Sequence, residues 1–348
     1  MLGVGLIIAG GAVALGSLFG LLNLSDEDVT EAINEEDLDE ALPLLDQTGI
    51  DLLEVAFAED PLLAQGDVAS EDDVLEVYVD TNDFSQVEGT DGADFIGIPE
   101  GVSDSDAVFG AGGNDVLMGN EFYNPMFGDQ GDDVLFGRGE GDYLFGDKGD
   151  DTVSGGEGDD LVVGGGGSDV LYGGEGNDNI YDNGETSDPG EFDVIVAGDG
   201  DDGIVIEDGI NLVSLGEGMD HVTMHTTEDD SPGAVITDFD PLEDALLLGV
   251  YAADFPLEEG TNSLELTVML REVETELGAG TLVEPAVEDA EMAEALEGSS
   301  VSFAFLLGVA PEDLAEADMR AVLTTAQSKN SASDGIFGIA KANGATFQ

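Results

Sequence analysis

A nine-residue repeat occupies the middle of this 348-residue chain. Between residues 101 and 181 every ninth residue is glycine, and the clearest copies read GGEGDDLVV (155–163), GGGGSDVLY (164–172) and GGEGNDNIY (173–181). The sixth position of these copies is aspartate and the eighth is aliphatic. Because a short fixed period makes neighbouring copies stack, an aspartate carboxylate is expected at the same place in each turn. Such a column of like charges repels itself unless a cation lies within it.

The pattern G-G-x-G-x-D-x-U-x, in which U is a large aliphatic residue, resembles the calcium-binding nonapeptide of the RTX, or haemolysin-type, family. The resemblance covers residues 89–223 in three blocks: a first copy at 89–97, copies in register over 101–181, and four looser copies over 188–223. It implies that the six-residue turn binds Ca²⁺ and that the last three residues form a short strand. It therefore implies an all-β fold, a right-handed parallel β-roll that holds several calcium ions.

The chemistry of the turn agrees with this implication. Calcium takes about six to eight oxygen ligands, which turn carbonyls and a carboxylate supply together. Glycines at positions one and four are expected to adopt positive φ and to expose those carbonyls. The Asn, Asp, Ser and Gly residues at position five are expected to tolerate the left-handed region. The eighth-position side chains are expected to point inward and to form a thin core: Ile96, Val108, Leu117, Met126, Leu135, Leu144, Val153, Val162, Leu171, Ile180, Ile195, Ile204, Val213 and Val222.

In the resembling family one coil uses two nonapeptides, so copies two apart lie above each other. Applied to this chain, the resemblance divides the sixth-position residues into two columns, one with Asp106, Asn124, Asp142, Asp160 and Asp178, the other with Asp115, Asp133, Asp151 and Asp169. Each ion would lie between vertical neighbours, which gives well-formed pairs at 115/133, 133/151, 151/169, 142/160 and 160/178. The first copy adds Asp94, and the looser copies add Asp193, Asp202 and Asp220.

One copy of the regular block departs from the pattern. Residues 119–127 read GNEFYNPMF, so Phe122 replaces the fourth-position glycine and Asn124 replaces the aspartate. The Cβ of Phe122 resists positive φ, and Pro125 removes a strand N–H. We expect weak calcium binding, or none, at the pairs 106/124 and 124/142, unless backbone carbonyls suffice with Asn124 as a neutral ligand.

The net charge limits the partners of the chain. Asp and Glu number 80 against 6 Lys and Arg, a formal net charge of −74. This balance excludes nucleic acid, which needs a basic surface, and disfavours anionic lipid surfaces. Metal binding explains part of the acidity, and adaptation to salt is a second explanation because acidic residues also fill non-repeat stretches. The chain has no cysteine, so bound ions rather than disulfides are expected to stabilise the fold.

The N-terminal segment from Leu2 to Leu22 is uncharged, apolar and long enough to cross a bilayer. It lacks the basic start and the small-x-small cleavage site of a signal peptide. We favour an apolar membrane-anchor helix over residues 1–24, with a cleaved signal as the alternative. With the repeat resemblance, this predicts an extracellular or cell-surface protein that is anchored to the membrane through residues 2–22.

The flanking regions complete the domain organisation. Residues 25–88 are read as an acidic linker with short helices and a leading strand at 74–79, and residues 89–223 as the roll. Residues 224–310 are expected to form a β-rich cap, with strands at 264–273 and 301–309, because an exposed solenoid end needs covering. The segment 234–250 resembles the one that follows the repeats in serralysin-type proteases. Residues 311–348 are read as a helix over 311–325 and a charge-poor tail that resembles a type I secretion signal.

The remaining motifs do not assemble into an active site. The aspartate pairs are explained by their period rather than by glycosidase chemistry, and no G-x-S-x-G elbow is present. The ninth-position aromatic residues are expected to pack on one another, with a ligand-stacking stripe as the alternative. We interpret the chain as a non-enzymatic calcium-binding protein with a structural or adhesive role. The alternative is a secreted hydrolase, of protease or lipase type, that carries this repeat module.

Overall fold

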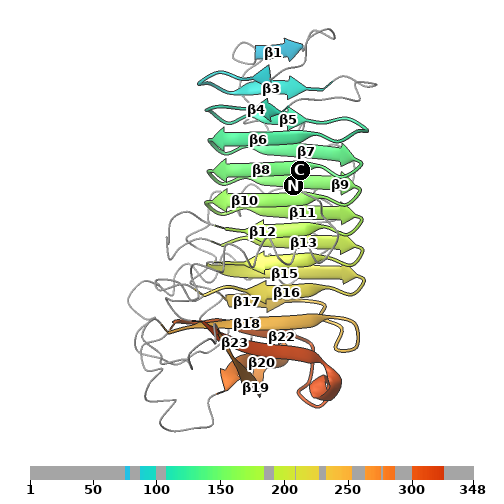
Figure 1. Cartoon of the computed structure of the whole chain (residues 1–348), viewed down its shortest axis with the longest axis vertical. Coiled ribbons are helices and arrows are strands. Elements are labelled where there is room, and N and C mark those ends of the chain that lie inside the picture. Colours follow the sequence, from blue (N-terminus) through green and yellow to red (C-terminus); the bar gives the residue numbers. More distant parts are fainter. Residues whose placement is uncertain are drawn as a thin grey trace.

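The structure, a computed structural model, describes residues 75–78, 87–98, 107–183, 192–207, 209–226, 233–252, 263–275, 277–286 and 300–324. These residues form an all-β fold, which Figure 1 shows as a tall stack of short strands. Within the described ranges the only helical element is a 3-10 turn, η2 (Asp313–Glu316), and none is long and apolar enough to cross a membrane. The predicted anchor at residues 2–22, the parts 25–74 and 79–86 of the linker predicted at 25–88, and the tail after Thr324 lie outside these ranges.

Successive strands alternate between two parallel ladders. The first ladder contains β1 (Leu75–Tyr78), β3 (Asp94–Gly97), β5 (Val116–Met118), β7 (Val134–Gly139), β9 (Thr152–Glu157), β11 (Val170–Glu175), β13 (Val194–Asp199), β15 (Ile210–Glu217) and β17 (Gly233–Ile236). The second contains β2 (Val87–Glu88), β4 (Val108–Phe109), β6 (Pro125–Gln130), β8 (Tyr143–Lys148), β10 (Leu161–Gly166), β12 (Asn179–Asp182), β14 (Gly203–Ile206), β16 (His221–Met224) and β18 (Ala245–Tyr251). This arrangement is consistent with a parallel β-roll.

The register confirms that one coil contains two nonapeptides. Leu135 lies beside Leu117 on one side and Val153 on the other, and each of these neighbours is two copies away in the chain. The insert after Asp182 lengthens one coil, so Leu171 lies beside Ile195. The strand expected at 74–79 is present as β1, and it extends the first ladder by pairing with β3.

The core is one column of aliphatic side chains for each ladder. Every eighth-position residue named from the sequence is at most 1% exposed. The prediction of an inward-facing eighth position is therefore confirmed. In the last coils the first position also contributes to the core, because Ala197, Ile206 and Leu215 replace glycine there and are fully buried.

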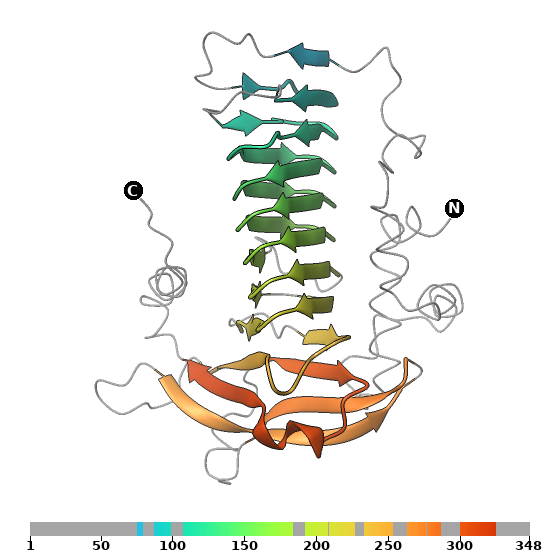
Figure 2. The same ribbon diagram turned by 90° about the vertical axis from the view of Figure 1, so that its right-hand side faces the viewer.

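A cap closes the C-terminal end of the roll and joins its two ladders (Figure 2). β22 (Phe303–Leu307) extends the first ladder and β23 (Asp318–Thr324) extends the second. The antiparallel hairpin of β19 (Ser263–Glu274) and β20 (Ala279–Ala286) pairs with both, β20 with β22 and β19 with β23. A short strand, β21 (Ser300–Val301), pairs with β18. Neither of the last ladder strands is therefore left as an open edge.

The helix predicted at residues 311–325 is wrong. The structure has η2 followed by β23, in which buried Ala321 and Leu323 alternate with less buried neighbours. β23 pairs with β18 over seven residues, from Asp318 opposite Ala245 to Thr324 opposite Tyr251. The unpaired edge of β18 thus overrides the weak local preference for helix, since propensity is a weak guide where tertiary pairing is available. The cap consequently extends to Thr324. The strands expected at 264–273 and 301–309 are present as β19 and as β21 with β22.

Candidate metal centre

The sixth-position side chains form one buried column along each ladder. Within a column, the backbone N–H of each sixth residue donates to the Oδ1 atom of its counterpart one coil later, over 2.6–3.1 Å. The first column runs through Asp94, Asp115, Asp133, Asp151, Asp169, Asp193 and Asn211. The second runs through Asn124, Asp142, Asp160, Asp178, Asp202, Asp220 and Asp244. The five pairs predicted in the regular block are therefore direct neighbours.

The second carboxylate oxygen of most of these aspartates has no hydrogen-bond partner. Eight Oδ2 atoms are buried without one, those of Asp115, Asp133, Asp142, Asp151, Asp160, Asp178, Asp202 and Asp220. A buried oxygen without a partner is costly, and native structures rarely leave one without a reason such as an ion. Each of these aspartates thus uses one oxygen to hold the fold and keeps the other available.

Burial raises the pKa of these carboxyls far above 3.8. The pKa rises to about 8 for Asp133, Asp142 and Asp178, to about 7 for Asp115, Asp151 and Asp220, and to about 6 for Asp160 and Asp202. The main cause is desolvation of the ionised form, and the donated backbone N–H opposes it. In several cases the neighbouring aspartates of the same column raise the pKa further. Without a cation, the column therefore resists full ionisation.

The first-position glycine makes room for the available oxygen. At Gly110 an added Cβ would meet Oδ2 of Asp115 and, at 2.7 Å, the carbonyl oxygen of Gly128 in the next coil. At Gly128 the same two kinds of oxygen converge, from Asp133 and, at 2.8 Å, from Gly146. When the carboxyl is ionised both oxygens are acceptors, so neither satisfies the other, whereas a cation between them would attract both. This glycine is required for close approach and does not itself adopt positive φ.

Positions two and four, rather than one and four, adopt positive φ. Position two does so at Ala111, Asp129, Arg138 and Asp147 and at several glycines, and position four at Gly113, Gly131 and Gly149 among others. The assignment of positive φ to position one is therefore wrong, and position five does not adopt it either. Position five instead carries hydrogen-bond acceptors: Asp150 donates its N–H to Oδ1 of Asp132 at 3.1 Å, and Ser168 donates to Asp150 at 2.9 Å.

The donor set fits calcium. Among the described residues no three His, Cys, Asp or Glu side chains converge on one point, so side chains alone do not make a cation cage there. The converging atoms are carboxylate and backbone carbonyl oxygens, which are hard ligands of the kind that calcium prefers. They recur at the same place in successive coils, which agrees with a row of ions rather than a single one.

The structure places the predicted ligands as follows. Asp115, Asp133, Asp142, Asp151, Asp160, Asp169, Asp178, Asp193, Asp202 and Asp220 lie in the two columns, whereas Asp106 lies outside the described residues. Asp94 begins the first column, but its Oδ2 already accepts the N–H of Thr90 at 2.6 Å. Sequence reasoning missed Asp244 and Asn211. Asp244 and Leu246 keep the spacing of positions six and eight, but the glycines that mark a copy are absent around them.

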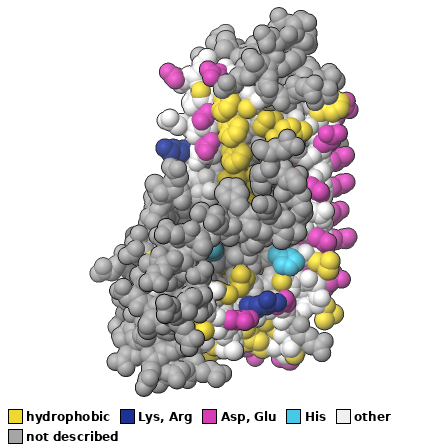
Figure 3. Space-filling model, in the orientation of Figure 1, with side chains coloured by type: hydrophobic (Ala, Val, Ile, Leu, Met, Phe, Trp, Pro, Cys, Tyr) yellow, Lys and Arg dark blue, Asp and Glu magenta, His cyan; other side chains and the backbone are white. Residues whose placement is uncertain are grey.

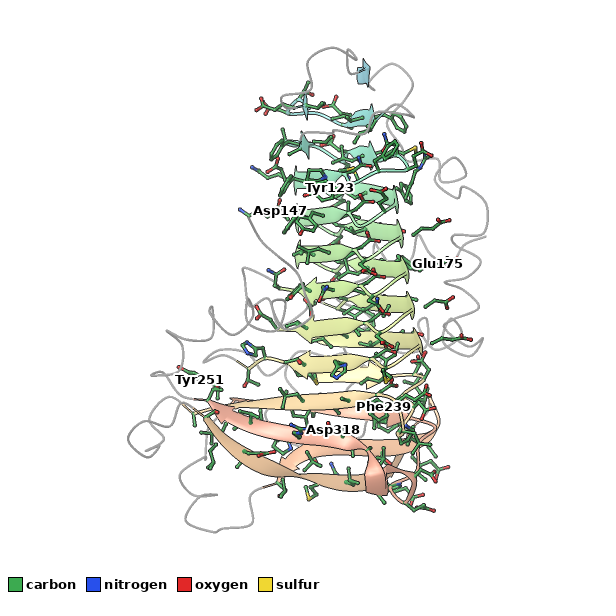
Figure 4. All side chains as sticks on the ribbon, turned by 45° about the vertical axis from the view of Figure 1, so that its right-hand side comes forward. Tyr123, Asp147, Glu175, Phe239, Tyr251 and Asp318 are labelled. Carbon is green, nitrogen blue, oxygen red and sulfur yellow. The ribbon has the colours of Figure 1, made fainter. Side chains whose placement is uncertain are left out.

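The outer surface of the roll carries two further rows of side chains. Glu157, Glu175, Asp199 and Glu217 lie in register at the ends of neighbouring strands and are exposed. Figure 3 shows a column of acidic side chains along this edge, and in Figure 4 Glu175 projects from it. On the second ladder the rings of Phe109, Phe127 and Phe145 stack, with centroids 4.8 and 4.9 Å apart. The expectation that ninth-position aromatics pack on one another is confirmed for these three.

Comparison with known families gives one match. The family model described as RTX calcium-binding nonapeptide repeat matches in four copies, over residues 100–121, 127–162 and 154–181. The matched residues lie within the regular block of the roll, and they indicate calcium binding. The post-repeat segment 234–250 is not part of this match. No curated protein and no solved structure matched the chain.

Proposed function

We propose that this chain is an exported calcium-binding protein whose roll folds when several Ca²⁺ ions bind along its two aspartate columns. Its role is structural or adhesive rather than enzymatic, and it acts outside the cell or at the cell surface. The family match supports the choice of calcium. The observation that carries the proposal is the set of buried, unpartnered Oδ2 atoms, each of which faces a carbonyl oxygen of the next coil in the regular block.

The environment of the columns favours calcium over other common cations. The available ligands are oxygens held on a stacked backbone, which suits the variable geometry of calcium. Magnesium prefers a smaller, near-octahedral shell and loses its water reluctantly, so it should substitute poorly. A monovalent cation would leave part of the negative charge of two neighbouring carboxylates of a column uncompensated.

The magnitude of the effect is large enough to control folding. Extracellular calcium modules bind with dissociation constants of about 10⁻⁴–10⁻³ M. At roughly 10 mM calcium a site at the tighter end of that range adds about 2.7 kcal/mol of stability, and five such sites add about 13 kcal/mol. A whole domain has a net stability of about 5–15 kcal/mol. At sub-micromolar calcium the same sites add almost nothing, so the roll is folded outside a cell and unfolded in a cytosol.

The experiment is a calcium titration of the full chain followed by far-ultraviolet circular dichroism. The spectrum should change from disordered to β on addition of millimolar calcium and revert with a chelator, whereas the same concentration of magnesium should give a much smaller change. A chelated sample that keeps the full β signal would show that the roll folds without metal. Equilibrium dialysis on the same samples measures whether calcium is bound at all.

The proposed location has a separate test. RTX repeats are typical of extracellular proteins, and the acidic surface suits solution rather than anionic membranes. Cell fractionation with an antibody to the repeats should find the chain in the membrane fraction if residues 2–22 anchor it. A shortened soluble form that starts after Leu22 would favour a cleaved signal.

Assays against casein and ester substrates test the proposal that the chain is not a hydrolase.

A further inference from the structure

Three turns at the described limits of the columns differ from the others in one hydrogen bond. In these turns the N–H of the residue at position two donates to a side-chain oxygen at position six, which is the second carboxylate oxygen of an aspartate or the single amide oxygen of Asn124. The bonds are Thr90 to Oδ2 of Asp94 at 2.6 Å, Asn120 to Oδ1 of Asn124 at 2.7 Å, and Asp240 to Oδ2 of Asp244 at 2.7 Å. We call these three the closed turns.

The closed turns share a second hydrogen bond, which the side chain at position two accepts. Position two is Thr90, Asn120 or Asp240, and its side-chain oxygen accepts the N–H of position four, at 3.2 Å from Gly92, 3.0 Å from Phe122 and 2.9 Å from Leu242. Thr, Asn and Asp make such local side-chain turns readily. In none of the three does position two or position four adopt positive φ. The side-chain turn therefore replaces the backbone conformation of the regular copies.

Eight other turns are open. For each of the eight aspartates with an unpartnered Oδ2, position two has positive φ: Ala111, Asp129, Arg138, Asp147, Gly156, Gly174, Gly198 and Gly216. Positive φ at position two thus goes with the absence of any partner for the second oxygen. The two classes differ at the atom that a cation would contact.

We infer that the conformation of position two decides which turns accept calcium, and that the closed turns hold no metal. This inference rests on the proposed function. An N–H carries a partial positive charge, so a donor aimed at the second oxygen occupies a ligand position and repels a cation there. In an open turn this donor is removed, and the oxygen is left for the ion.

The positions of the closed turns agree with this role. Thr90–Asp94 opens the first column, Asn120–Asn124 is the first described turn of the second column, and Asp240–Asp244 ends that column against the cap. Each closed turn still joins the backbone ladder, because Asp94 and Asn124 donate to the next coil and Asp244 accepts from Asp220. The ladder thus continues through a turn without an ion and leaves no buried carboxylate oxygen of that turn unsatisfied.

The test compares the same substitution in one closed and one open turn of the second column. Bound calcium per full-length chain is measured by equilibrium dialysis and elemental analysis. Asp244→Asn should leave the number of ions unchanged because a closed turn holds no ion, although asparagine keeps only one of the two acceptors that the Asp244 carboxylate offers to the N–H groups of Asp220 and Asp240. The matched control, Asp202→Asn, should lose at least one ion. Equal losses in both variants would overturn the inference.

A gain-of-binding variant tests the same rule in the other direction. Asp240→Gly combined with Leu242→Gly gives the C-terminal turn the glycines of an open copy, and it should bind one calcium ion more than the unmodified chain. An unchanged number would contradict the rule. Because the unmodified chain is measured alongside, a failure of the proposed function is distinguishable: that chain would then bind no calcium.

Discussion

Each sixth-position aspartate has two separate tasks, one for each oxygen. Oδ1 of Asp160 accepts the N–H of Asp142 at 2.6 Å and so fixes the spacing of the coils, while Oδ2 is buried without a partner. An asparagine can perform the first task, as Asn211 does for Asp193, but it brings no charge to the second. The loss of an aspartate should therefore affect both the metal and the ladder.

At this residue scale, Asp160→Ala should remove the two calcium sites that it shares with Asp142 and Asp178. Asn124→Ala should change the calcium stoichiometry little, because Asn124 belongs to a closed turn. Anomalous scattering from calcium in crystals of each variant measures the occupied sites. Full-occupancy ions on both sides of Asn124 in the unmodified protein would contradict this prediction.

A second residue-scale prediction concerns the first-position glycines. Gly155→Ala would place a Cβ 2.6 Å from the carbonyl oxygen of Gly173 and against the Asp160 carboxylate, so both backbone and ligand must move. We expect a loss of about 1–3 kcal/mol in the free energy of unfolding at saturating calcium, as for overpacked sites. Gly112→Ala is the matched control, since its nearest neighbours are 3.8 and 3.9 Å away and its φ is not positive. Urea denaturation of both variants distinguishes them, and equal losses would refute the close-approach argument.

Much of this residue-level arrangement follows from the period alone. The core positions and the members of both columns could be predicted, because a fixed repeat places equivalent residues at equivalent points. The direction of φ at positions one, two and five could not. A glycine in a sequence does not show whether it is needed for its φ or for the approach of another backbone: Gly110 is needed for close approach alone, whereas Gly131 combines positive φ with close approach to the backbone of Gly113. Asp244 was missed because its copy lacks the glycines that mark the other copies of the repeat.

At the scale of single elements, the capping strands show where local patterns fail. The acidic start and the leucines of residues 311–325 suit an amphipathic helix, yet β23 is a strand because β18 offers it seven pairing partners. β18 is distant from β23 in the sequence, so no pattern within residues 311–325 indicates this pairing. Of the two hairpin strands, the first, β19, could in contrast be predicted from the alternation in its own sequence.

The capping role of β23 predicts a large effect at its buried positions. Leu323→Ala removes a fully buried side chain from the main core and should cost about 2–5 kcal/mol. Arg320→Ala, on the same strand, removes an exposed side chain whose partner is Asp318, and it should change stability by about 1 kcal/mol or less. Denaturant unfolding at saturating calcium measures both. Similar small effects would show that β23 does not help to close the roll.

At the scale of the whole molecule, the buried carboxyls couple folding to pH. The usual aspartate pKa of 3.8 is raised to between about 6 and about 8 for these carboxyls in the folded, metal-free chain. The folded chain therefore holds protons that the unfolded chain has released, and its stability without metal falls as the pH rises from about 4 to about 8. Calcium must displace these protons, so its apparent affinity should increase with pH in the same window.

Two measurements check this pH dependence. With a chelator present, the β signal in far-ultraviolet circular dichroism should be greater at pH 5, where the buried carboxyls are protonated, than at pH 8. Calorimetric titration with calcium at pH 6.5, in two buffers of different ionisation enthalpy, should report proton release. Near neutral pH the apparent affinity should increase up to about tenfold per pH unit for each displaced proton. A calcium affinity that is constant from pH 6 to pH 8 would contradict the raised pKa values.

The cap also gives the stack a direction. Its hairpin closes the C-terminal end, and the main core is thickest there, through residues such as Phe239, Leu306 and Leu314. Coils are therefore best added onto the cap, one after another, toward the N-terminus. Synthesis delivers the chain in the opposite order, so the coils are made before the cap on which they stack. Until the cap has been synthesised, a newly made chain would have no folded base onto which its coils could pack.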